Sequence, residues 1–184
     1  MRIYFIRHGH ADHNEAFDKT QDRKVYRSFD YKYSHLTQKG INQIKDIVLP
    51  EKMDRTYSSP LIRCLETSHI LVDDKTVLYL HDGLMETQGP YPCNWRPDFD
   101  SLSRSMKRYN LKDINVKYEP YTSYYHTNIK ETKEDLQQRA LNTLEQIKYE
   151  CVNLNTIMII THYDWLEALL GKSFMNGEVH CVEY

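Results

Sequence analysis

Three groups of polar residues in this sequence have the chemistry to act on a phosphoryl group. They are Arg7-His8, Ser58-Ser59 together with Arg63, and His162. Arginine stays charged and offers a planar fork of donors to phosphate oxygens. Histidine, with an ordinary pKa of about 6.5, presents an unprotonated ring nitrogen that can attack phosphorus near neutral pH. Brought together by the fold, these side chains would form a phosphoryl site.

Each group directly follows a segment whose sequence predicts a β-strand. Residues 2–6 (RIYFI) and 55–58 are short and rich in strand-forming side chains. Residues 156–160 (TIMII) are apolar on both faces, as in a central parallel strand. Two more strands are expected over 76–80 and 179–184. Because α/β proteins bind ligands at the carboxyl ends of parallel strands, the three groups should meet at that edge.

Segments between the strands predict helices. Thr37 is expected to cap a helix, and Ser59-Pro60 is expected to begin another. The second helix would place Arg63 in its first turn, where free backbone N–H groups favour an anion. The apolar side of the first consists of Ile41, Ile44 and Val48. Further helices are expected after residues 132–135 and after His162, the latter ended by Gly171.

Strands that alternate with helices predict an α/β fold, here a three-layer sandwich with a mostly parallel central sheet flanked by helices. A chain of 184 residues fits one domain, 1–184. Residues 11–35 show no clear period and predict an irregular segment. Residues 82–130, rich in glycine and proline, predict an insertion that shapes substrate choice.

Several segments resemble, in order, the motifs of the histidine phosphatase (phosphoglycerate mutase-like) superfamily. They are RHGHADHN, HLTQKGINQ, SSPLIRCLETS, LMETQG and ITHYDWLEALL. The resemblance runs from residue 2 to about 171 and implies the α/β fold of that family. The pair His13-Asn14 and the segment GPYPCNWR are most similar to the phosphoglycerate mutase-like proteins of plants and fungi.

The resemblance also implies roles for individual residues. His8 would be the nucleophile that becomes phosphohistidine. Arg7, Arg63 and His162 would hold the phosphoryl oxygens and stabilise the charge of the transition state.

Two further residues match family positions. Asn14 matches a phosphate-contacting asparagine, and Glu86 matches the carboxyl that protonates the leaving oxygen and then activates water. To donate a proton near neutral pH, Glu86 needs a raised pKa. The sequence departs from the family pattern at Tyr163-Asp164, where small glycines are frequent, and at His10. These departures remove no catalytic group, but they mean that the family resemblance does not identify the substrate.

The expected activity is therefore that of a phosphomonoesterase of the histidine acid phosphatase type. Its substrate would be a small-molecule phosphate ester or a phosphoprotein. A phosphoglycerate-type phosphomutase is the alternative, because it uses the same phosphohistidine but returns the phosphoryl group to a sugar-acid oxygen. The shorter length of this chain favours hydrolysis over the mutase.

Two other interpretations compete with this one. The string His8-Gly9-His10-Ala11-Asp12-His13 also fits HxHxDH, the zinc-binding signature of metallo-β-lactamase-like hydrolases. That reading leaves SSPLIRC and Arg7 unexplained, so we expect neither a metal nor another cofactor. A non-catalytic phosphate-binding protein is disfavoured because both the nucleophile and the acid are present.

Composition narrows the expected partners. The formal net charge of −2 gives no reason to expect nucleic-acid binding. The mean hydropathy is −0.70, and no apolar run approaches the roughly 20 residues of a membrane span. The first residues do not resemble a signal peptide, and the four cysteines form no CxxC pair. We expect a cytoplasmic protein with reduced thiols, whose apolar last strand leaves room for an oligomer.

Overall fold

A five-stranded mixed sheet forms the centre of the molecule. The computed structural model describes residues 1–72, 77–108 and 129–184. The strands are β1 (Arg2–Arg7), β2 (Arg55–Ser58), β3 (Leu78–Leu80), β4 (Thr156–Thr161) and β5 (Val179–Glu183). Their order is β3-β2-β4-β1-β5, and only the pairing of β1 with β5 is antiparallel. The predicted mostly parallel sheet is confirmed.

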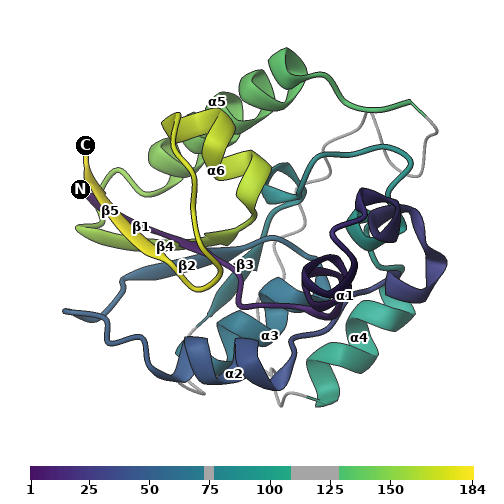
Figure 1. Cartoon of the computed structure of the whole chain (residues 1–184). Helices are drawn as coiled ribbons and strands as arrows, with labels where there is room; N and C mark the ends of the chain where they lie inside the picture. Colours follow the sequence, from purple (N-terminus) through teal and green to yellow (C-terminus); the bar gives the residue numbers. More distant parts are fainter. Residues whose placement is uncertain (73–76, 109–128) are drawn as a thin grey trace.

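Helices surround this sheet. The α-helices are α1 (Asp12–Thr20), α2 (Gln38–Lys45), α3 (Ile62–Leu71), α4 (Phe99–Arg108), α5 (Lys133–Glu150) and α6 (Tyr163–Leu170). Short 3-10 helices are η1 (Arg23–Arg27), η2 (Phe29–Tyr31), η3 (Asp82–Leu84) and η4 (Pro92–Asn94). Figure 1 shows α5 and α6 over one face of the sheet and α2 and α3 over the other. The predicted sandwich of three layers is confirmed.

The two faces of the sheet have separate cores. On the side of α5 and α6, Phe5 of β1 packs against Trp165, with ring centroids 6.3 Å apart. On the side of α3, Ile6 and Ile160 pack around Cys64. Because successive strand residues point to opposite faces, strands buried on both sides must be apolar throughout, as residues 156–160 are.

The prediction of an irregular segment over residues 11–35 is wrong. This segment folds into α1, η1 and η2. Only His13 of α1 is buried, so the helix lacks the apolar stripe from which it could have been predicted. Instead, the side chain of Asn14 caps α1 by accepting a hydrogen bond from the backbone N–H of Ala11 at 3.0 Å.

Two predicted helix boundaries also need correction. Helix α3 begins at Ile62 with Leu61 as its N-cap, not at Ser59-Pro60, because the backbone N–H of Ser59 still bonds Ile160 of β4. Arg63 nevertheless stays in the first turn. Thr37 caps α2 as predicted, but the helix ends at Lys45 and leaves Val48 89% exposed.

Part of the predicted insertion can be followed. Residues 82–108 contain η3, η4 and α4, whereas residues 109–128 lie outside the described part of the chain, as does Thr76 of the third predicted strand. In the described ranges, no helix combines the length and the apolar character needed to cross a bilayer.

Helix α2 lies tightly against the segment that follows β1. A Cβ atom on Gly40 would lie 2.0 Å from the backbone oxygen of His10. This clash is with backbone, so the helix or the loop would have to move. The replacement Gly40→Ala should therefore lower the free energy of unfolding, by about 1–3 kcal/mol as for other overpacked sites. Urea denaturation measures the change.

The matched control is Lys45→Ala, an exposed position at the end of the same helix. It should change the free energy of unfolding by less than about 0.5 kcal/mol. Equal stabilities of Gly40→Ala and Lys45→Ala would contradict the close approach of α2 to His10.

Candidate active site

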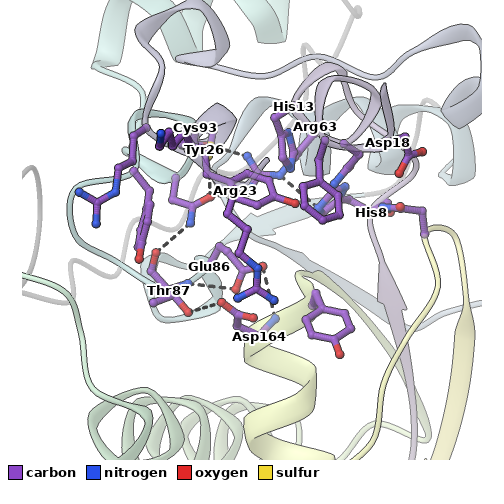
Figure 2. Close-up of a pocket in the computed structure, with 18 of the residues that line it drawn as sticks. His8, His13, Asp18, Arg23, Tyr26, Arg63, Glu86, Thr87, Cys93 and Asp164 are labelled. Carbon is purple, nitrogen blue, oxygen red and sulfur yellow. Dashed lines mark hydrogen bonds between the residues drawn. The ribbon is translucent and has the colours of Figure 1, made fainter. Parts of the chain in front are cut away.

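The predicted site residues converge on one cavity at the carboxyl edge of the sheet. The cavity has a volume of about 740 Å³. Five of the six predicted residues line it: Arg7, His8, Asn14, Arg63 and Glu86. Figure 2 shows His8 and Arg63 on one side of the cavity and Glu86 on another. The fold thus joins groups that are far apart in the sequence.

His8 follows β1, and its ring is held in one tautomer. Its Nδ1 lies 2.7 Å from the backbone oxygen of Gly9, which can only accept, so Nδ1 carries the proton. Its Nε2 accepts a hydrogen bond from Nε–H of Arg63 at 3.1 Å. Burial, followed by the charges of Arg63 and Arg7, lowers the pKa of His8 well below its usual value. His8 is therefore neutral, and its unprotonated Nε2 uses its lone pair to accept from Arg63.

Arg63 is the link between the separate parts of the site. Besides His8, its guanidinium donates to the backbone oxygen of Cys93 at 2.6 Å and to Oδ1 of Asn94 at 3.1 Å. It also donates to Nδ1 of His162 at 3.2 Å. The side chain is 1% exposed, yet every partner that it bonds is neutral.

His162 lies behind this arginine and does not line the cavity. Because Nδ1 accepts from Arg63, the ring proton lies on Nε2, which bonds Oγ of Ser59 at 2.8 Å. Its ring centroid is 5.1 Å from that of His8. Burial and then Arg63 lower its pKa well below the usual value. His162 is thus placed to orient Arg63 and His8, while direct contact with a phosphoryl group stays a prediction.

Arg7, the last residue of β1, lies beside Tyr163. Its guanidinium carbon is 5.0 Å from the centroid of that ring, and one of its terminal nitrogens donates to the backbone oxygen of Phe174. Its Nε is buried and has no hydrogen-bond partner among the described residues. A buried, unpartnered donor on a cavity wall is a natural contact for an anionic oxygen.

Glu86 lies in the loop after η3, with its carboxylate held by backbone donors. Oε1 accepts from the N–H of Thr87 at 3.0 Å, and Oε2 accepts from the N–H of Asp164 at 3.3 Å. Burial, followed by the charge of Asp164, raises the pKa of Glu86 to about 7. The carboxyl is therefore partly protonated near neutral pH, as an acid that protonates a leaving group requires.

Sequence reasoning missed the buried ion pair that supports this loop. Arg139 of α5 donates to both carboxylate oxygens of Glu131, at 2.7 Å each. The same guanidinium donates to the backbone oxygens of Gly83 and Met85 at 2.9 and 2.8 Å, and to that of Glu86 at 3.4 Å. An arginine on the apolar side of an amphipathic helix is the signal that could have revealed it.

Asp164, noted only as a departure from the family pattern, is also part of the site. Its Oδ2 accepts a hydrogen bond from the hydroxyl of Thr87 at 2.6 Å, next to Glu86. Figure 2 shows these three side chains grouped at one end of the cavity. A carboxylate at this position raises the proton affinity of its neighbour, which glycine could not do.

The HxHxDH string does not gather into a metal site. The ring of His10 bonds Thr37 and Asp18, at 2.8 and 3.1 Å. The carboxylate of Asp12 accepts from Ser34 and from its own neighbour's N–H. Within residues 1–72, 77–108 and 129–184, no group of three or more His, Cys, Asp or Glu side chains is arranged to hold a metal ion.

Sequence comparison with protein families decides the assignment. Residues 3–178 match the family described as Histidine phosphatase superfamily (branch 1). The chain belongs to this superfamily. A comparison with curated proteins found no match. The closer likeness to plant and fungal members therefore stays a prediction.

Solved structures of low sequence identity share the superfamily fold. They include the ecdysone phosphate phosphatase of Bombix mori, with a TM-score of 0.69 and 15% identity over 100% of this chain and 89% of that one. A phosphoserine phosphatase of Entamoeba histolytica has a TM-score of 0.64 and 16% identity, over 98% and 89%. A phosphoglycerate mutase of Thermus thermophilus has a TM-score of 0.59 and 20% identity, over 100% and 94%.

The contact between Asp164 and Glu86 leads to a prediction about the pKa of Glu86. Replacing Asp164 by Asn removes a negative charge but keeps the backbone N–H that bonds Glu86. The pKa of Glu86 should therefore fall from about 7 toward its ordinary value. Carbon-13 NMR of labelled glutamate carboxyls measures it, with Glu86→Gln identifying the resonance. The control is Asp18→Asn, a cavity carboxylate whose partners are His10 and Lys39. A Glu86 pKa that responds equally to both changes would contradict this account.

Proposed function

We propose that this member of the superfamily is a phosphomonoesterase that works through a phosphohistidine on His8. One observation carries the proposal: a neutral His8 and a carboxyl with a pKa of about 7, Glu86, line the same cavity as the buried guanidinium of Arg63. A nucleophile, a proton donor and a charge stabiliser are the three groups that phosphoryl transfer to a side chain requires.

The reaction proceeds in two steps. In the first, Nε–H of Arg63 turns from Nε2 of His8 to a phosphoryl oxygen, which frees the Nε2 lone pair. Nε2 then attacks phosphorus in line, the P–O ester bond breaks, and Glu86 gives its proton to the leaving oxygen. In the second, the Glu86 carboxylate takes a proton from water as the water oxygen attacks phosphorus. The P–N bond breaks, phosphate leaves, and both His8 and the protonated Glu86 are restored.

The surrounding residues stabilise the charge that develops on the phosphoryl oxygens. Arg63 and the unpartnered Nε of Arg7 present buried donors to the cavity, and contacts to buried donors are stronger than those in water. Asn14 offers its amide from α1, and His162 keeps Arg63 oriented. No step of this mechanism requires a metal or another cofactor.

The natural substrate in this proposal is a small phosphate ester or a phosphoprotein. The enzyme would act in the cytoplasm, and its activity would be of the histidine acid phosphatase type. A mutase would use the same phosphohistidine and differ only in the acceptor, which would be a substrate hydroxyl instead of water. Incubating a labelled phosphoenzyme in buffer with and without phosphoglycerate separates the two. A phosphatase releases the label as inorganic phosphate in both cases, whereas a mutase transfers it to phosphoglycerate.

The first prediction of this mechanism concerns the nucleophile, His8. His8→Ala should lower kcat/KM for an aryl phosphate by at least about 10⁴-fold, because no other group forms the intermediate. Phosphoenzyme trapped from a labelled substrate should be labile in acid and stable in alkali, as expected for a P–N bond. An acid-stable adduct, or a His8→Ala variant that retains turnover, would refute the mechanism.

The second prediction concerns the proton donor, Glu86. Glu86→Gln should reduce turnover of alkyl phosphates by about 100-fold or more, since their leaving groups need a proton. Aryl phosphates, which leave more easily, should lose less than about tenfold. The measurement is kcat/KM for both classes, with Glu15→Gln on the exposed surface of α1 as the control. Equal losses on both classes would argue against Glu86 as the acid.

A further inference from the structure

The cavity is much larger than a phosphoryl group, and its outer wall is basic. Four cationic side chains line it in addition to Arg7 and Arg63: Arg23, Lys24, Arg27 and Lys130. All four are exposed. Figure 2 shows Arg23 pointing into the cavity, on the side of Glu86 and Asp164. The mechanism proposed above uses none of these four residues.

The next question for these cations is whether carboxylates pair with them. Within residues 1–72, 77–108 and 129–184, no carboxylate forms an ion pair with any of the four. Four acidic residues line the same cavity, and each has other partners: Glu86 accepts from two backbone N–H groups, and Asp164 accepts from Thr87. Asp18 contacts His10 and Lys39, and Asp22 accepts the backbone N–H of Lys24 at 2.9 Å.

The turn that carries most of the basic wall packs against neighbouring elements of the pocket. Three of its residues belong to η1, which is capped by Asp22. Tyr26 in the same turn stacks on Phe17 of α1, with centroids 5.6 Å apart, and lies edge-on to His13 at 5.9 Å. The thiol of Cys93 reaches the backbone oxygen of Tyr26 at 3.5 Å. These contacts join η1 to α1 and to η4, the element whose backbone Arg63 also bonds.

We propose that this wall is a subsite for a second anionic group, so that the preferred substrates are phosphomonoesters that also carry a carboxylate or another phosphate. The ester phosphate would lie against Arg7 and Arg63, and the second anion against Arg23, Lys24 and Arg27. The inference rests on the proposed function for the identity of the first anion. Charged hydrogen bonds to the second one are the strong kind, and arginine binds carboxylate and phosphate through the same planar fork.

Binding of uncleavable phosphonates tests the subsite without turnover. The probes are para-carboxybenzylphosphonate and its neutral, nearly isosteric partner para-carbamoylbenzylphosphonate, with Kd measured by calorimetry on the wild-type chain. The carboxylate should bind about tenfold more tightly or better, as expected for a charge-assisted contact. Raising the salt concentration should reduce this ratio. A third probe, para-xylylenediphosphonate, shows whether carboxylate or phosphate is the better second anion.

Variants assign the preference to the wall. The triple variant Arg23→Gln, Lys24→Gln, Arg27→Gln should bring the Kd values of the carboxylate and carboxamide probes to within about twofold of each other. The matched control, Lys45→Gln, Lys52→Gln, Lys133→Gln, removes the same charge from exposed positions outside the cavity and should keep the tenfold ratio.

The outcomes separate the two proposals. Equal binding of the carboxylate and carboxamide probes to the wild-type chain would overturn the subsite and leave the phosphatase proposal intact. A preference that disappears equally in the control variant would also overturn it, because the effect would then be one of net charge. Failure of every phosphonate to bind would refute the phosphoryl site itself.

Discussion

The buried guanidinium of Arg63 is the interaction on which this site depends. It is bonded to the ring of His8 after β1, to η4 and to the ring of His162 at the start of α6, so it joins three segments around the cavity. All of its hydrogen-bond acceptors are neutral. A buried charge whose hydrogen bonds all go to neutral groups is costly, and an anion that enters the cavity relieves that cost. Burial, and after it the same charge, lowers the pKa values of His8 and His162 well below their usual value.

A second buried arginine, Arg139, differs from Arg63 in having a carboxylate as its partner. Arg139 is paired with Glu131 through two short contacts, and together they hold backbone oxygens of the loop that carries Glu86. This guanidinium is neutralised within the protein and does not line the cavity. One arginine thus shapes the loop of the proposed acid, while the other, which bonds neutral acceptors, faces the place where a phosphoryl group would bind. The difference lies in the partners, because the side chains are chemically identical.

Much of this arrangement could be anticipated from local patterns. Strand segments such as 156–160, with apolar residues on both faces, predicted the central strand, and the residues that follow strands predicted the edge where His8 and Arg63 meet. Helix α1 was missed because it packs through His13 and through its cap, without an apolar stripe. The role of Asp164 beside Glu86 was missed because its effect on the pKa of Glu86 depends on burial and distance. Neither property can be read from the residues that neighbour Asp164 in the sequence.

The sequence by itself determined the order and type of the main elements and the motifs that assign the chain to its superfamily, since both depend on periodicity and on short runs of residues. Only the tertiary structure decided the tautomers of His8 and His162, the raised pKa of Glu86 and the basic wall formed by η1. Each of these properties arises between residues distant in the chain, such as Arg63 and His162, and from the exclusion of water around them. Burial and long-range contact are properties of the folded molecule, so no local pattern contains them.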